Sequence, residues 1–311
     1  MDHLNIVIIG AGALGVYFGG RLQEVGENVT FLVRERRATE LREHGLAIKS
    51  IKGDYPLPNV SYTTDVQDID SADIVLLAVK GYHLDGTLPQ LKTLVQKGAK
   101  VIPLLNGIEH IDTLQTELGE ENVIGGLAFI IATLDKKGHV VHTSEQHRFV
   151  FGPLHSSQEQ LCEQFHEITN KANMENELHE NILTSLWNKY MFITAFSGIT
   201  TATNLPIGPI RDNDQTLQVA KDTLLEMKRL ANGYDALITE DHVENAVNLL
   251  FQFPNDGTSS MHQDKRKGLT IEVDHLHGGA LRLAKKIGIE LPVIKTIHGV
   301  IKPYEHGSPT E

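Results

Sequence analysis

The chain has 311 residues, which predicts about two domains, each large enough to bury its own core. Its 28 Lys and Arg against 40 Asp and Glu leave a formal net charge of -12, and no block of basic residues concentrates a positive field. Nucleic acid and anionic membranes are therefore not expected partners. A lone cysteine, Cys162, excludes an intrachain disulfide. With no basic leader and no apolar stretch of ~20 residues, we expect a cytoplasmic protein.

The 16 histidines do not follow a metal-binding pattern. The chain contains neither HExxH nor CxxC, and His275 and His277 are two positions apart, which directs them to different sides of a helix. No metal site is predicted.

Residues 1 to about 155 alternate short apolar runs with amphipathic stretches. Runs bounded by Gly, Asp or Asn are typical of strands covered on both faces: NIVIIG, NVTFLV, LAIKSI, ADIVLLAV, KVIPLL and NVIGGLAFIIA. The alternation up to Lys100 predicts a parallel sheet with crossover helices. Two further runs, HVVHTS and RFVFGP, predict an antiparallel hairpin that turns across residues 144–147.

From about residue 156 the hydrophobic period changes to 3.6. The pattern predicts helices over 158–172, 182–196, 215–231 and 240–251, with a short strand at 175–179. A final pair of helices lies on either side of Gly268, the second beginning at Thr270. We expect the chain to fray after Pro303.

The first apolar run ends in GAGALG, which fits the pattern G-x-G-x-x-G at Gly10, Gly12 and Gly15. These glycines suit a tight turn, close approach to a pyrophosphate and close helix packing. The strand before the motif and the helix after it favour a dinucleotide site over a chance turn, with Ala11, Ala13 and Leu14 as further cofactor contacts. The fold class is therefore an α/β Rossmann-type domain over 1–178 followed by an all-helical domain over 179–311.

Polar residues at the ends of other strands refine this site. Arg34 ends the second strand, where a guanidinium suits the extra phosphate of NADP and a carboxylate would suit NAD. The adjacent Glu35 leaves some ambiguity, and an ordinary exposed arginine is the alternative. Lys80 and Asn106 follow two later strands, although a solvated lysine and an Asn-Gly turn are also common there.

Two charged residues lie on apolar helical rows in the second half. Lys189 shares a row with Leu186 and Ile193, where an unpaired ammonium would cost several kcal/mol unless it reaches a carboxylate, a cleft or solvent. Glu272 lies one turn before Leu276 on another such row, although acids are also favoured in any first helical turn. Lys189 and Glu272 are least costly if they share one pocket.

Together these residues make the chain resemble the ketopantoate reductase (2-dehydropantoate 2-reductase) family. The motifs that carry the resemblance span almost the whole chain: GAGALG, Arg34, VK at Lys80, LLNG at Asn106, WNK at Lys189 and TSSMHQDKRKGLTIEVD from Thr258 to Asp274.

The resemblance implies NADPH as hydride donor and a 2-keto acid as substrate. It makes Lys189 the general acid and Glu272 the acidic residue that organises the site. Ser260 matches a substrate-binding serine, and Lys80 and Asn106 match residues that contact cofactor and substrate. Helical second domains in such enzymes often pair, so a homodimer is the assembly to test.

Three positions depart from the family pattern. Substrate-binding asparagines of the family are replaced by Ile193, Ser197 and Gly257, of which Ser197 still offers a hydroxyl to the substrate. A site built on hydrogen bonds to the substrate discriminates strongly through such groups. The alternatives are therefore a reductase of another 2-keto acid and a non-catalytic NADP sensor.

Overall fold

The computed structural model describes residues 3–307. Their contacts form two compact units. The first contains the chain up to Leu105 together with His110–Ile182, and the second contains Asn106–Glu109 together with the chain from Leu183 onward. The predicted boundary after residue 178 lies close to the main division, whereas the sequence predicts no boundary at Asn106.

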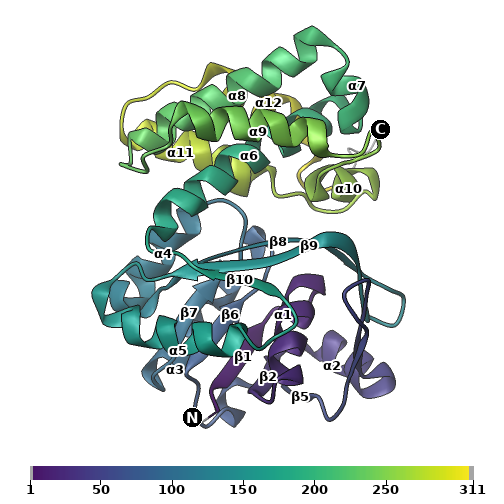
Figure 1. Ribbon diagram of the computed structural model, residues 1–311, viewed down its shortest axis with the longest axis vertical. Helices are drawn as coiled ribbons and strands as arrows, with labels where there is room; N and C mark the ends of the chain where they lie inside the picture. Colours follow the sequence, from purple (N-terminus) through teal and green to yellow (C-terminus); the bar gives the residue numbers. More distant parts are fainter. Residues whose placement is uncertain (1–2, 308–311) are drawn as a thin grey trace. The chain divides into compact units, whose positions relative to one another are not determined.

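Five parallel strands form the first sheet of the first unit, in the order β5-β2-β1-β6-β7 (Figure 1). The chain turns to one side of β1 to form β2 and later returns to the other side to form β6. Ligands of open parallel sheets bind at the carboxyl ends of strands at such a reversal. The strands are β1 (Asn5–Ile9), β2 (Asn28–Leu32), β5 (Ser61–Thr63), β6 (Ile74–Leu77) and β7 (Lys100–Pro103).

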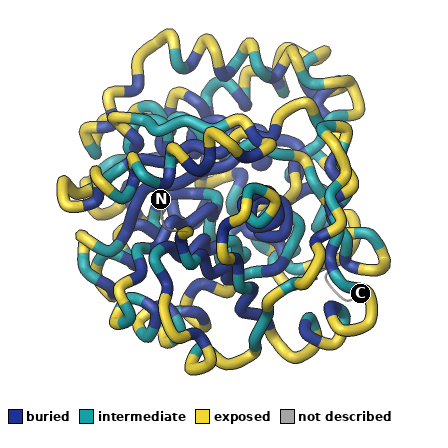
Figure 2. The backbone as a smooth tube through the Cα atoms, turned by 60° about the horizontal axis from the view of Figure 1, so that its bottom comes forward, coloured by how far each residue is buried: buried dark blue, intermediate teal, exposed yellow. Residues whose placement is uncertain are grey.

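Helices follow β1, β2, β6 and β7 of this sheet in the chain, as the alternating pattern predicts. They are α1 (Ala13–Glu24), α2 (Glu35–His44), α3 (Leu88–Gln96) and α4 (Glu109–Leu118). Apolar side chains of α1 and both sheets form one core, in which Ile8, Phe18 and Phe149 are almost fully buried. Figure 2 shows buried positions in the interior and exposed positions along outer helices and turns.

A second sheet is built around the long strand β9 (Val140–Gly152). It pairs antiparallel with β8 (Gly125–Leu134), and parallel with β3 (Leu46–Ser50) and β10 (Glu175–Leu178); β4 (Tyr55–Leu57) pairs with β3. The predicted strand at 175–179 is confirmed, and α5 (Glu159–Thr169) forms within the predicted helix 158–172. The LAIKSI run belongs to this sheet as β3, and not to the parallel sheet.

The predicted hairpin across residues 144–147 is wrong. β9 runs through these residues without a turn, and the chain reverses instead at Asp135, whose N–H donates to the His139 carbonyl. Partners far away in the sequence keep the polar stretch extended, because His147 is buried with Nδ1 2.8 Å from the Tyr17 hydroxyl. Ser144 also accepts a hydrogen bond from the backbone of β8.

Helices make up the second unit, as predicted. They are α6 (Ile182–Thr203), α7 (Ile207–Arg211), α8 (Asp214–Asn232), α9 (Glu240–Gln252), α10 (Ser260–Arg266), α11 (Gly279–Lys286) and α12 (Pro292–Ile301). The sequence patterns do not predict α7 and α12. A π-helix, Asp274–Gly278, directly precedes α11. In the described part of the chain, no helix has both the length and the apolar character of a membrane span.

The predicted helix start at Thr270 is also wrong. Thr270 forms a β-bridge with His306, and the Ile271 N–H donates to the Glu305 carbonyl. These tertiary partners keep the segment extended and delay the helix until Val273. The same contacts hold the chain beyond Pro303 up to Gly307, contrary to the predicted fraying; residues 308–311 lie outside the described range.

Candidate active site

The glycine-rich turn after β1 has the geometry of a phosphate cradle. Gly10 has a φ of +102°, and a Cβ there would lie 2.5 Å from the Ala78 carbonyl oxygen. A Cβ on Gly15 would lie 2.2 Å from the Gly10 carbonyl oxygen, so the turn packs tightly under α1. A Cβ on Gly12 would meet nothing within 4 Å, which leaves space for a ligand. α1 then begins at Ala13 without an acid in its first turn, which favours an anion.

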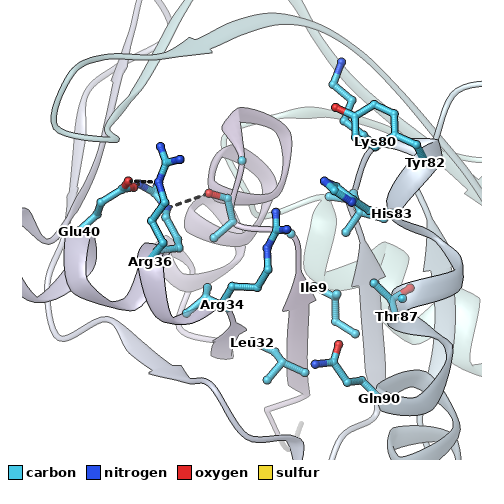
Figure 3. A pocket seen from close by; sticks show the side chains of 18 residues that line it. Ile9, Leu32, Arg34, Arg36, Glu40, Lys80, Tyr82, His83, Thr87 and Gln90 are labelled. Atoms are coloured by element: carbon cyan, nitrogen blue, oxygen red, sulfur yellow. Dashed lines mark hydrogen bonds and ion pairs between the residues drawn. The ribbon is translucent and has the colours of Figure 1, made fainter. Parts of the chain in front are cut away.

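A cavity of about 780 Å³ opens beside this turn, which is a size suited to a cofactor (Figure 3). Among the predicted cofactor residues, Gly10, Ala11, Gly12, Arg34 and Lys80 line the cavity. Ala13, Leu14, Gly15 and Asn106 do not line it. All the lining residues belong to the first unit.

The three arginines after β2 have different surroundings. Arg37 is structural, because its Nε donates to the Ala11 carbonyl at 3.0 Å and its Nη2 donates to the Gly138 carbonyl at 2.7 Å. Arg36 is exposed and pairs with Glu40. The Arg34 side chain lies in the cavity, and its guanidinium makes no hydrogen bond or ion pair with any residue between 3 and 307 (Figure 3). It is therefore the arginine that is available for an anionic ligand.

Sequence reasoning missed other residues of this cavity. Tyr82, His83 and Gln90 line it from the segment after β6 and from α3. His83 faces Arg34 across the cavity in Figure 3, and its pKa is lowered by burial and by the Arg34 charge. The signal available in the sequence was weak, because Tyr82 and His83 lie in a short helical turn and Gln90 lies in α3, and none of the three is at the end of a strand.

Lys189 lies in densely packed surroundings in the second unit. It follows Leu186 on a buried row of α6, while Lys189 itself and Ile193, one turn further on, keep some exposure. Burial lowers the pKa of Lys189 to about 8, and the Glu272 carboxylate opposes that change. At pH 7 about nine-tenths of such lysines carry the proton.

Glu272 is buried, with 6% of its surface exposed, at the entry to the π-helix. Its backbone carbonyl accepts the Leu276 N–H at 2.9 Å. The predicted apolar row continues as buried Leu276, Ala280 and Leu283, but Ile287 is 38% exposed. The π-helix widens one turn and shifts the register of the row, and such turns often occur at functional sites.

The remaining predicted residues are also in the second unit. Asn106 is partly exposed, and its carbonyl is hydrogen-bonded by the His275 Nε2. Ser197 is buried on α6. The neighbouring Ser259 caps α10, since its Oγ accepts the His262 N–H at 3.1 Å, and this leaves Ser260 exposed at the first turn of the helix.

Taken together, the structure divides the predicted residues between two units. The glycine-rich turn, Arg34 and Lys80 surround a cofactor-sized cavity in the first unit. A buried acid and a lysine whose pKa has been brought near neutrality lie in the second unit. A lysine whose pKa is lowered to near neutrality, with a carboxylate close by, is suited to proton transfer at neutral pH.

Two family descriptions match nearly the full chain. Residues 6–156 match "Ketopantoate reductase PanE/ApbA", and residues 181–305 match "Ketopantoate reductase PanE/ApbA C terminal".

Two relatives and one solved structure show similarity over the same extent. An uncharacterized oxidoreductase, YkpB, of Bacillus subtilis is 33% identical over 97% of this chain and 99% of its own. A 2-dehydropantoate 2-reductase of Pyrococcus abyssi is 30% identical over 97% and 98%. A D-mandelate dehydrogenase solved with NADH and anilino(oxo)acetate superposes with a TM-score of 0.87 at 20% identity, covering 96% of this chain and 98% of that one. This last likeness shows the fold.

Proposed function

We propose that this chain, an oxidoreductase that belongs to the ketopantoate reductase PanE/ApbA family, uses NADPH to reduce 2-dehydropantoate to pantoate. The observation that carries the proposal is Lys189, whose pKa of about 8 is set by burial and opposed by a buried carboxylate. A binding protein without catalytic activity has no need to keep a proton donor poised in this way.

The residues of the first unit fit NADPH. Gly10 and Gly15 form the tight turn, Gly12 leaves room for the pyrophosphate, and the amino terminus of α1 favours its charge. Arg34 is proposed to hold the 2′-phosphate, with Lys80 in the same cavity. Bound NADPH supplies a hydride to the C2 carbonyl carbon of the 2-keto acid.

The residues of the second unit are proposed to handle the proton. As negative charge develops on the substrate oxygen, the Lys189 ammonium stabilises it and donates a proton, a contribution of typically ~10²–10⁴-fold. Glu272 keeps Lys189 protonated by opposing the effect of burial. Ser260, Asn106 and Ser197 are proposed to contact the substrate, the first of them at the start of α10, where a carboxylate is favoured.

The test is a panel of 2-keto acids assayed by the loss of NADPH absorbance. The panel includes 2-dehydropantoate, pyruvate, a branched aliphatic keto acid and phenylglyoxylate. We expect the highest kcat/KM for 2-dehydropantoate. If NADPH binds but no keto acid oxidises it, the chain is an NADP sensor and the proposal fails. Light scattering on the same sample tests the expected homodimer.

A second candidate is the reduction of a different 2-keto acid on the same scaffold. Ile193 is a partly exposed apolar side chain one turn from Lys189, and it cannot hydrogen-bond a substrate hydroxyl. The D-mandelate dehydrogenase with the same fold was solved with an aromatic oxoacid. A preference for phenylglyoxylate in the panel would favour this candidate.

A further inference from the structure

The Asn106–Glu109 segment belongs to the second unit, although the residues on both sides of it belong to the first. It connects β7 to α4, and its Gly107 has a φ of +84°. The chain therefore leaves the first unit after Leu105 and re-enters it at His110. Contacts with the π-helix and with α11, both in the second unit, reach this segment.

The strongest of these contacts is a forked ion pair between Glu109 and Arg282 of α11. The Arg282 Nε lies 3.0 Å from each carboxylate oxygen of Glu109, and its Nη2 lies 2.7 Å from Oε2. Forked pairs of this kind fix orientation as well as distance. The pair raises the pKa of Arg282 above its ordinary value. A second contact holds the turn itself, since the His275 Nε2 hydrogen-bonds the Asn106 carbonyl.

The π-helix supports this pair from the other side. The Asp274 Oδ2 accepts from the Arg282 Nη1 at 2.9 Å, and its Oδ1 accepts from the Lys302 Nζ at 3.0 Å. Asp274 thus orients the guanidinium toward Glu109. The same π-helix contacts the helix of the candidate proton donor, because the Tyr190 hydroxyl donates to the Leu276 carbonyl.

One short element therefore joins three candidate site residues. Glu272 lies two residues before the π-helix, Tyr190 next to Lys189 donates to it, and His275 within it contacts Asn106. We infer that Glu109 and Arg282 are positioning residues that hold the Asn106 turn on the same unit as Lys189 and Glu272. The inference rests on the proposed function, in which Asn106 contacts the 2-keto acid.

Arg282→Met in the full-length protein tests the inference. A partly exposed pair adds little to stability, so we expect Tm to change by less than about 4 °C. A displaced Asn106 should raise KM for the keto acid by about tenfold or more, with a smaller fall in kcat. The affinity for NADPH, measured by its fluorescence, should stay within about twofold because the cavity lies in the other unit.

Further variants separate positioning from general damage. Glu109→Gln should also raise KM, and the double variant should be no worse than Arg282→Met alone, because that change already removes the pair with Glu109. Lys92→Met is the matched control, since it breaks an exposed pair with Glu117 in the first unit, and it should leave KM unchanged. An unchanged KM in Arg282→Met, or an equal loss of NADPH affinity, overturns the inference.

Hydrogen exchange of the Asn106–Glu109 backbone amides gives a readout that needs no substrate. These amides should exchange faster in Arg282→Met than in the wild type. In Lys92→Met their exchange rates should equal those of the wild type. Unchanged exchange in Arg282→Met overturns the positioning role. If the wild type reduces no 2-keto acid but exchange is still faster in Arg282→Met, the proposed function is refuted and the positioning role of the ion pair stands.

Discussion

Replacing Glu272 with glutamine should move the pH dependence of the reaction. Lys189 must be protonated to donate, and its pKa of about 8 reflects burial opposed by the Glu272 charge. Glu272→Gln removes the opposing charge and keeps the burial, so the pKa of Lys189 falls. The rate of keto acid reduction then declines at lower pH than in the wild type.

The size of the effect follows from protonation. A neighbouring opposite charge shifts a pKa by about one unit or more, which would bring Lys189 to about pH 7 or below in the variant. At pH 8 the protonated fraction then falls from about one half to about one tenth, a loss of about fivefold in kcat/KM. At pH 6 both proteins keep most of the proton, and their rates should differ much less.

The assay is kcat/KM for the best keto acid, measured from pH 5.5 to pH 10 with NADPH absorbance. Glu240→Gln is a matched control, because Glu240 is an exposed acid of the same unit that pairs with Lys228. Its profile should coincide with that of the wild type. If Glu272→Gln leaves the basic limb where it is, or if the wild-type rate shows no decline up to pH 10, Lys189 is not the titrating proton donor.

Three other changes have direct readouts. Lys189→Ala should lower turnover by about 100-fold or more, while the affinity for NADPH stays the same. Unchanged turnover would show that Lys189 is not the proton donor. Arg34→Ala should lower the preference for NADPH over NADH, and an unaltered ratio places the 2′-phosphate elsewhere. His277 is fully buried, and its pKa is lowered to about 4. As the pH falls below 6.5, the imidazole therefore becomes protonated in the unfolded state before it does so in the folded state. Between pH 7 and pH 4.5, the free energy of unfolding of the wild type, measured with urea, should fall by about 2–3 kcal/mol more than that of His277→Asn. Equal losses in both proteins would contradict this assignment.

Local patterns in the sequence determined the architecture of each unit. The β1 run, the glycines from Gly10 to Gly15 and α1 are adjacent in the chain, so short-range sterics and hydrophobic period suffice to predict them. The same holds for α8 and α9, whose predicted ranges agree with the structure to within one residue, and for the start of α6, which continues to Thr203 beyond its predicted end at residue 196. Arg34 could be selected from its place at the end of β2, which the strand pattern locates.

Only the tertiary structure decided features that depend on distant partners. β9 stays extended through residues 144–147 because it pairs with β8. Thr270 stays out of a helix because it forms a β-bridge with His306. Local propensity cannot predict either partner. The ion pair of Glu109 with Arg282 joins residues 173 positions apart, and no spacing rule reaches that far. The pKa of Lys189 also depends on the tertiary structure, because it is set by burial and by the Glu272 carboxylate, which comes from a distant part of the chain.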